Sequence, residues 1–128
     1  MTILLDTCTF LWVVSGADEL SARARGLVAD PANQVLLSAA SAWEISVKHA
    51  LGRLPLPDDP RRFVAAERAR HRIDPLPIDE AAALNVGHLP PLHRDPFDRM
   101  LVSQAVLGGL TILTPDRLIR QYPAASTW

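Results

Sequence analysis

The chain has 128 residues, of which 48% are hydrophobic and 21% charged, and its formal net charge is -1. This composition fits one globular domain over residues 1–128, and the charge excludes a globally basic surface, so a nucleic acid would have to bind through local patches. No apolar run approaches the ~20 residues of a membrane span. The N-terminal residues MTILLD lack the features of a signal peptide, and the single cysteine forms no internal disulfide, so we expect a cytoplasmic protein.

Four short apolar runs are predicted to be β-strands. They are TILLD (2–6), QVLLSA (34–39), IDPLPI (73–78) and LTILT (110–114). The third run is the weakest candidate, because its two prolines cannot donate hydrogen bonds, and we expect it at the edge of a sheet. The other runs are apolar throughout rather than alternating, which indicates a parallel sheet covered by helices on both faces.

Helical segments separate these runs. The predicted helices span residues 7–14, 21–30, 41–51, 60–71, 79–87 and 96–108, with a short one near 116–121. Strands that alternate with helices imply right-handed crossovers and an α/β sandwich with a mainly parallel sheet. The sequence has no internal repeat, low-complexity tract or domain linker.

Four acidic residues recur at equivalent places in this pattern. Asp6 closes the first strand, Glu44 and Asp98 lie in the predicted first turns of their helices, and Asp116 follows the last strand. In a parallel sheet these places face the same edge, where open α/β folds build their sites. Carboxylates gathered there would raise one another's pKa values unless a cation neutralised them. Oxygen ligands are those that Mg²⁺ or Mn²⁺ prefers.

Helix capping offers a structural explanation for each acid. SAWE (41–44) reads as a capping box, and the stretch HRDPFDRMLVSQA (93–105) places Asp95 and Asp98 at a helix start. Asp116 could begin a helix, and Asp6 could be an ordinary turn residue. A cap works equally well with Ser, Thr or Asn, however, so an acid that recurs at one edge of several β/α units favours a common site.

Four segments resemble the motif blocks of PIN-domain proteins of the VapC toxin type. They are ILLDTCTFLW (3–12), SAWEISVKHALGRLPL (41–56), LPPLHRDPFDRMLVSQA (89–105) and LTILTPDRLI (110–119). The resemblance implies a PIN-like three-layer α/β/α sandwich. It also implies that the metal-binding, catalytic acids are Asp6, Glu44, Asp98 and Asp116. Asp98 rather than Asp95 matches the third acid, and Cys8 departs from a His that close relatives often have.

The resemblance also implies an activity and partners. The activity is metal-dependent hydrolysis of RNA by a Mg²⁺- or Mn²⁺-activated water that attacks phosphorus in line and leaves a 5′-phosphate and a 3′-hydroxyl. The partners are a VapB-like antitoxin and a second copy of the chain in a homodimer. An antitoxin would best block the four acids with a basic residue, for which arginine is suited because its fork pairs two carboxylates at once. Apolar residues beside the acids, Phe10, Leu11, Trp12 and Trp43, are candidates for antitoxin contact, although core packing is favoured for most of them.

Several other polar residues have alternative explanations. The histidines lack metal-ligand spacing, and we expect them to be surface or loop residues, with His93 the only one near the site. Cys8 is expected to be a small buried thiol rather than a nucleophile. Arg94 and Arg99 could contact a phosphate, although an ion pair would also explain Arg99. Thr7 and Thr114 could orient carboxylates or make ordinary strand-end hydrogen bonds. A stripe of Arg61, Arg68 and Arg72 is either a solvated face or a contact surface.

Other functional classes fit the sequence less well. A haloacid-type phosphatase would need a second Asp two residues after Asp6, where Cys8 stands, and a receiver domain would need a lysine on a late strand, whereas Lys48 is the only lysine. A catalytically silent PIN-fold binding module is the remaining alternative. The complete set of four acids argues against it.

Overall fold

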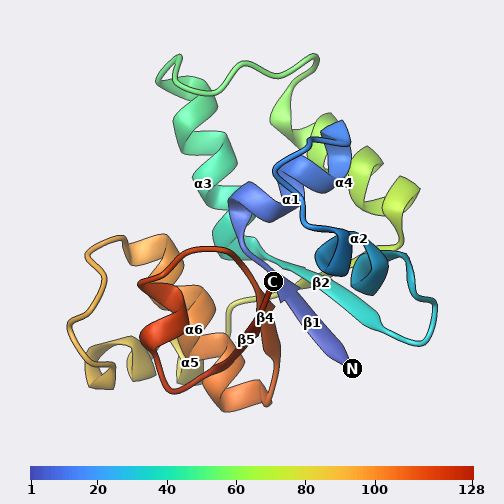
Figure 1. Cartoon of the computed structure of the whole chain (residues 1–128). Helices are drawn as coiled ribbons and strands as arrows, with labels where there is room; N and C mark the ends of the chain where they lie inside the picture. Colours follow the sequence, from blue (N-terminus) through green and yellow to red (C-terminus); the bar gives the residue numbers. More distant parts are fainter.

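The computed structural model describes residues 1–128 and contains a five-stranded sheet between helices (Figure 1). The strands are β1 (Thr2–Leu5), β2 (Gln34–Ser38), β3 (Ile73–Leu76), β4 (Thr111–Leu113) and β5 (Ala125–Thr127). Their order is β3-β2-β1-β4-β5, and all neighbouring pairs are parallel. The predicted parallel sheet is confirmed, and the proline-containing β3 lies at an edge, as its missing hydrogen-bond donors predicted.

Helices cover both faces of this sheet. They are α1 (Thr7–Ser15), α2 (Ala22–Ala29), α3 (Ala39–Ala50), α4 (Pro60–His71), α5 (Glu80–Asn85), α6 (Pro96–Gly108) and the 3₁₀ turns η1 (Val86–His88) and η2 (Ile119–Gln121). In Figure 1, α1, α2 and α4 lie on one side of the strands and α5 and α6 on the other. This arrangement confirms the predicted three-layer α/β/α architecture. No helix has the length and apolar character needed to cross a membrane.

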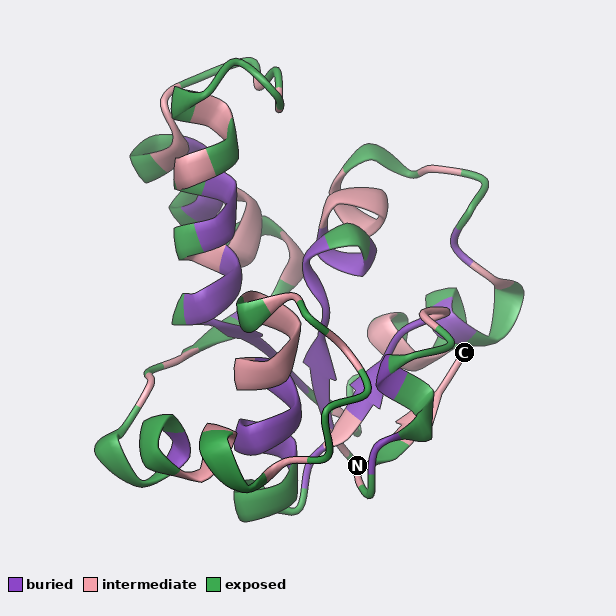
Figure 2. Ribbon diagram, turned by 90° about the vertical axis from the view of Figure 1, so that its left-hand side faces the viewer, coloured by how far each residue is buried: buried purple, intermediate pink, exposed green.

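The alternation of side chains along β1 divides the core into two parts. Ile3 and Leu5 pack in a cluster with residues of α1, α2, α3 and α4, whereas Leu4 packs with residues of α6 and η2. Figure 2 shows this burial along the strands and the inward sides of the helices. Each fully buried aliphatic side chain of this kind contributes about 1.5–3 kcal/mol to folding. The two clusters therefore hold both helical layers against the sheet.

The start of α3 differs from the predicted one. Ser38, at the end of β2, caps the helix, because its hydroxyl oxygen accepts a hydrogen bond from the backbone N–H of Ala40 at 3.0 Å. Ser41 consequently lies inside the helix, where its buried hydroxyl group has no hydrogen-bond partner. The predicted capping box is therefore wrong, and Glu44 lies beyond the first turn of α3, which contains no acidic residue.

Three further elements differ from the sequence prediction. The helix expected at 79–87 is divided into α5 and η1, and the helix expected near 116–121 is only the short turn η2. Strand β5 was not predicted at all. It completes the sheet beside β4, where the backbone N–H of Thr114 also donates to the carbonyl oxygen of Thr127 at 3.1 Å.

The strand order reverses between β1 and β4. The chain passes from β1 to β2 and β3 on one side, and then returns to place β4 on the other side of β1. Open α/β folds bind ligands outside the carboxyl ends of the strands at such a reversal. The residues that follow β1 and β4 here include Asp6 and Asp116. The topology therefore brings two of the predicted site residues to the same crevice.

Candidate metal site

Asp6 is held between two elements. Its Oδ1 accepts a hydrogen bond from the backbone N–H of Thr9 at 2.8 Å and so caps α1, and its Oδ2 accepts one from the hydroxyl group of Thr114 at 2.5 Å. Both Asp6 and Thr114 are buried. Burial raises the pKa of Asp6, although the hydrogen bonds from Thr114 and Thr9 oppose that shift. The carboxyl group is thus fixed in orientation at the end of β1.

Glu44 is buried on α3 and also has two polar contacts. The hydroxyl group of Thr7 donates to its Oε1 at 2.6 Å, and the ammonium group of Lys48, one helical turn later, donates to its Oε2. This hydrogen bond to Glu44 raises the pKa of Lys48. The side chain of Lys48 is 46% exposed. The ammonium group of Lys48 therefore already pairs with one oxygen of Glu44, while nearly half of the Lys48 side chain remains exposed.

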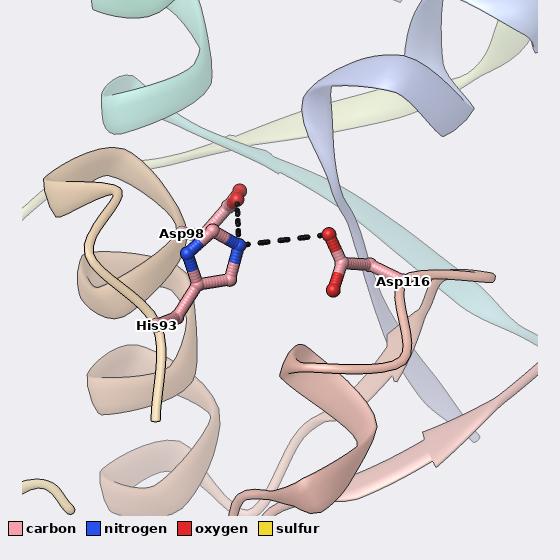
Figure 3. Close-up of side chains that lie close together, drawn as sticks. All are labelled: His93, Asp98 and Asp116. Carbon is pink, nitrogen blue, oxygen red and sulfur yellow. Dashed lines mark ion pairs between the residues drawn. The ribbon is translucent and has the colours of Figure 1, made fainter. Parts of the chain in front are cut away.

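His93, Asp98 and Asp116 converge on one point from separate segments (Figure 3). His93 comes from the loop before α6, Asp98 from the first turn of α6, and Asp116 from the loop after β4. The Nε2 atom of His93 lies 3.0 Å from Asp98 Oδ2 and 3.5 Å from Asp116 Oδ2. One potential ligand atom from each residue lies within 4.8 Å of the others.

Sequence analysis missed the contribution of His93. Its side chain is only 15% exposed and points at two of the predicted acids. It does lie in a loop, as expected, but it is not a surface side chain. The only sequence signal was its position two residues before the helix cap Asp95, and a lone histidine there has no recognisable metal-ligand spacing.

The acids also interact electrostatically. Burial, followed by the charges of Asp95, Glu44, Asp6 and Asp116, raises the pKa of Asp98 to about 8. Carboxylates that are close together and partly removed from water stabilise the protonated form in this way. A divalent cation would relieve the repulsion, and its preference for carboxylate oxygens fits this set of donors. The structure thus brings Asp98 and Asp116 together with His93 in a group that could hold a metal ion. Asp6 and Glu44 do not belong to this group, but their charges act on Asp98.

Asp95 caps the helix that carries Asp98. Its Oδ1 accepts hydrogen bonds from the backbone N–H groups of Phe97 at 2.8 Å and Asp98 at 3.4 Å. The predicted N-terminal cap of α6, with Pro96 at the first helical position, is confirmed. Asp95 therefore fixes the first turn of α6 and adds its charge to the surroundings of Asp98.

The two oxygens of Asp116 have different surroundings. Its Oδ1 accepts hydrogen bonds from the backbone N–H groups of Leu118 at 2.8 Å and Ile119 at 3.1 Å, which stabilises the turn before η2. Its Oδ2 faces His93. The capping and site explanations of Asp116 therefore apply together, one to each oxygen.

Two residues near the acids differ from expectation. Cys8 is exposed, so the expected buried thiol is wrong. Partial burial of its sulfur and the charges of Asp6 and Glu44 raise its pKa, which favours the unreactive thiol. Arg99 forms no ion pair. Its guanidinium group instead donates to the carbonyl oxygens of Val86 and Pro90 and to the hydroxyl group of Tyr122 at 2.9, 3.0 and 3.1 Å, which anchors the loop that carries His93.

The aromatic residues considered as contact candidates divide into core and surface. Phe10 is fully buried, and Trp12 packs against Trp128 with ring centroids 5.8 Å apart. Trp43 is 58% exposed and meets Phe97 edge to face at 4.9 Å. The two rings belong to the residues next to Glu44 and Asp98 in the sequence, and Trp43 leaves apolar surface exposed. The largest cavity, of about 460 Å³, lies elsewhere and is lined by none of the four acids.

Comparison with known proteins identifies a family for this fold. The PIN domain family matches residues 3–125. Ribonuclease VapC16 from Mycobacterium tuberculosis is 44% identical over 57 residues, which are 44% of this chain. The matched segment spans only 40% of the length of that relative.

Solved structures agree with this fold along almost the entire chain. VapBC2 from Rickettsia felis, bound to a DNA fragment from the promoter, has a TM-score of 0.73 at 13% identity and covers 99% of this chain and 98% of its own. VapBC-1 from nontypeable Haemophilus influenzae has a TM-score of 0.64 at 16% identity, with coverages of 99% and 97%. FitAcB from Neisseria gonorrhoeae has a TM-score of 0.61 at 21% identity, with coverages of 98% and 96%. Since the family match spans nearly every residue and the fold agrees with it, the chain belongs to the PIN domain family.

Proposed function

We propose that this protein is a Mg²⁺- or Mn²⁺-dependent endoribonuclease that acts as the toxin of a toxin–antitoxin pair. The observation that carries the proposal is the gathering of acids around Asp98, whose pKa is raised to about 8 by burial and by the carboxylates around it. The similarity to Ribonuclease VapC16 supports RNA as the substrate. The solved VapBC structures support a VapB-like antitoxin as the partner.

In this proposal the metal ligands are Asp6, Glu44, Asp98 and Asp116. The bound cation would polarise the scissile phosphate and lower the pKa of a water molecule that attacks it. Ligands that are held in place favour such a reaction, because they do not have to reorient as charge develops. Here Thr114 and Thr7 hold two ligands in place, since their hydroxyl groups orient the carboxyl groups of Asp6 and Glu44.

Binding of a cation would displace the proton of Asp98 and the ammonium group of Lys48. Asp98, with a pKa of about 8, must release its proton before it serves as a ligand. The hydrogen bond from Lys48 to Oε2 of Glu44 must break. The half-exposed side chain of Lys48 has room to move away, and a lysine displaced from Glu44 would remain at the rim of the site, where it could contact an RNA phosphate.

The test is a cleavage assay on purified protein with single-stranded RNA. We expect cleavage with Mg²⁺ or Mn²⁺, inhibition by EDTA, and loss of cleavage in Asp6→Asn and Asp98→Asn. Asp18→Asn, at an exposed position outside the acid group, is the matched control and should cleave normally. Unchanged cleavage in both site variants would refute the assignment of the acids. RNA binding without cleavage by the unmodified protein would instead indicate a silent PIN-fold binding module.

Assembly and location complete the proposal. We propose a cytoplasmic homodimer that is kept inactive by a VapB-like antitoxin. Size-exclusion chromatography with light scattering, on the protein alone and after co-expression with the antitoxin, measures both states of assembly. A monomer at micromolar concentration would contradict the homodimer and leave the assignment of the acids unaffected.

A further inference from the structure

Both ring nitrogens of His93 have defined partners. Nδ1 lies 3.1 Å from the backbone nitrogen of Asp95, which donates to it. Nε2 faces the Oδ2 atoms of Asp98 and Asp116 at 3.0 and 3.5 Å. The backbone N–H of His93 in turn donates to the hydroxyl group of the buried Tyr122 at 2.8 Å. The imidazole is therefore fixed in position and in the direction of each nitrogen.

The contact with Asp95 determines which nitrogen carries the hydrogen. A backbone N–H only donates, so Nδ1 must be the acceptor and carries no hydrogen. In a neutral imidazole the hydrogen then resides on Nε2, which points at two carboxyl groups.

The same contact opposes metal ligation by His93. To bind a cation through Nε2, the ring would have to move its hydrogen to Nδ1. The backbone N–H of Asp95 would then lose its acceptor at this partly buried position. Metal-binding histidines usually donate from the other ring nitrogen to a carboxylate or carbonyl oxygen, which is the reverse of this arrangement.

We infer that His93 is a positioning residue and not a metal ligand, although its Nε2 lies among potential ligand atoms. Its Nε2 lies between Oδ2 of Asp98 and Oδ2 of Asp116, at 3.0 and 3.5 Å, and this fixed ring holds the two acids at the spacing seen here. Carboxylates that bind metals are commonly oriented by hydrogen bonds from neighbouring groups. This inference rests on the proposed function insofar as these acids are taken to bind the cation.

The first test reads the hydrogen position directly in the metal-free protein. We expect the ¹⁵N resonances of the His93 ring to show hydrogen on Nε2 and an unprotonated Nδ1, with His93→Gln identifying the signals by their loss. Hydrogen on Nδ1 would overturn the inference. This measurement requires neither metal binding nor ribonuclease activity. It therefore tests the hydrogen position on His93 even if the proposed function is wrong.

The second test compares Mn²⁺ and Co²⁺ binding by calorimetry in the unmodified protein, His93→Ala and His93→Gln. Removing an orienting hydrogen bond should weaken both metals by a similar factor, about 10- to 100-fold. Glutamine should restore most of this loss, because its amide N–H₂ group can occupy the place of Nε2–H between the two acids. Electron spin echo spectra of bound Mn²⁺ should lack imidazole nitrogen coupling. Nitrogen coupling that disappears in His93→Gln, with a selective loss of Co²⁺ affinity, would show that His93 is a ligand.

Discussion

The hydroxyl group of Thr114 donates to Oδ2 of Asp6 at 2.5 Å and thereby joins the end of β4 to the end of β1. The hydroxyl oxygen of Thr114 also accepts a hydrogen bond from the backbone N–H of Asp116 at 3.0 Å. The buried side chain of Thr114 therefore sets the relative positions of Asp6 and Asp116, which are 110 residues apart in the sequence (116 − 6). Both explanations that the sequence left open for Thr114 are seen, because its hydroxyl group orients the carboxyl group of Asp6 and also makes a hydrogen bond at the end of the strand.

Replacing Thr114 by valine should test this relationship. Valine has nearly the same shape, so the packing is preserved while both hydrogen bonds disappear. We expect the free energy of unfolding to fall by about 1.5–3 kcal/mol, the usual contribution of a hydrogen bond to a charged group, and RNA cleavage to fall with it. Urea unfolding and cleavage assays measure the two effects. Thr114→Ser keeps the hydroxyl group and should retain most of both, whereas equal losses in serine and valine variants would assign the effect to packing.

The two aspartates at the start of α6 should separate in function. Asp95→Ser keeps an N-cap side chain and should retain most activity, whereas Asp98→Ser should lose it. Asp95→Ala should destabilise the protein by ~1 kcal/mol, because the N–H groups of Phe97 and Asp98 lose their acceptor. Chemical denaturation and RNA cleavage of the three variants measure these effects. Equal loss of activity in the two serine variants would show that Asp95 also serves the site.

The sequence was sufficient to predict β1 to β4, the helices that alternate with them, and a parallel sheet covered by helices on both faces. Apolar runs without alternation predicted the parallel sheet, and Pro75 and Pro77 predicted that the third strand is an edge strand. Asp6 and Asp116 could be placed because Asp6 directly follows β1 and Asp116 lies in the loop after β4. In this pattern, local signals and the overall fold agree, which is the condition under which sequence reasoning works.

The features that were missed depend on contacts between distant residues. Strand β5 has no apolar pattern, and it exists because the exposed edge of β4 pairs with it. The helix start at Ser38 competed with an equally good signal at Ser41. His93 reaches the acids only because Tyr122 and Arg99 hold its loop from other parts of the chain. No short sequence window contains these contacts.

The stability of the metal-free protein should fall as the pH rises from about 4 to about 8. Folding raises the pKa of Asp98 to about 8, from about 4 in an unfolded chain. The folded protein therefore keeps a proton that the unfolded chain has released in this range, and each rise in pH favours unfolding. The raised pKa of Asp6 acts in the same direction. Thermal unfolding in EDTA at about pH 5.5 and about pH 8 measures how steeply the stability falls with pH.

Asp98→Asn should reduce this slope, because the amide does not titrate. Adding Mn²⁺ should raise the melting temperature more at the higher pH, where the cation does not have to displace the proton of Asp98. The same slope in the variant and in the unmodified protein would show that Asp98 does not hold the extra proton.

Lys48→Met should tighten divalent metal binding. The ammonium group of Lys48 competes with a cation for Oε2 of Glu44 and repels it. A unit charge a few ångströms away in a water-like medium contributes on the order of 1 kcal/mol, which corresponds to about fivefold in affinity. Titration of each variant with Mn²⁺ measures the effect. Arg53→Met is the control variant, because Arg53 is an exposed positive charge on the loop after α3. Unchanged affinity in Lys48→Met, or an equal gain in both variants, would rule out direct competition.

An antitoxin that blocks this site should place an arginine among the acids. No arginine of the chain forms an ion pair with these acids; Arg99 instead donates to carbonyl oxygens of the segment before α6, and Lys48 pairs with Glu44 alone. Asp98 and Asp116 each leave carboxylate oxygens that an arginine fork can pair. The exposed ring of Trp43, packed on Phe97, offers apolar surface for the rest of the antitoxin segment.

Co-expression with the product of the adjacent upstream reading frame, followed by co-purification and a metal-dependent cleavage assay, tests this prediction. We expect a stable complex without cleavage, and cleavage again when the basic residue of the antitoxin segment is replaced by alanine. Asp98→Asn should weaken the complex by about 2 kcal/mol or more, because one member of a desolvated charge pair is lost, whereas Asp18→Asn should leave it unchanged. A stable complex with undiminished cleavage would rule out blocking of the site, and no complex at all would indicate a nuclease that acts alone.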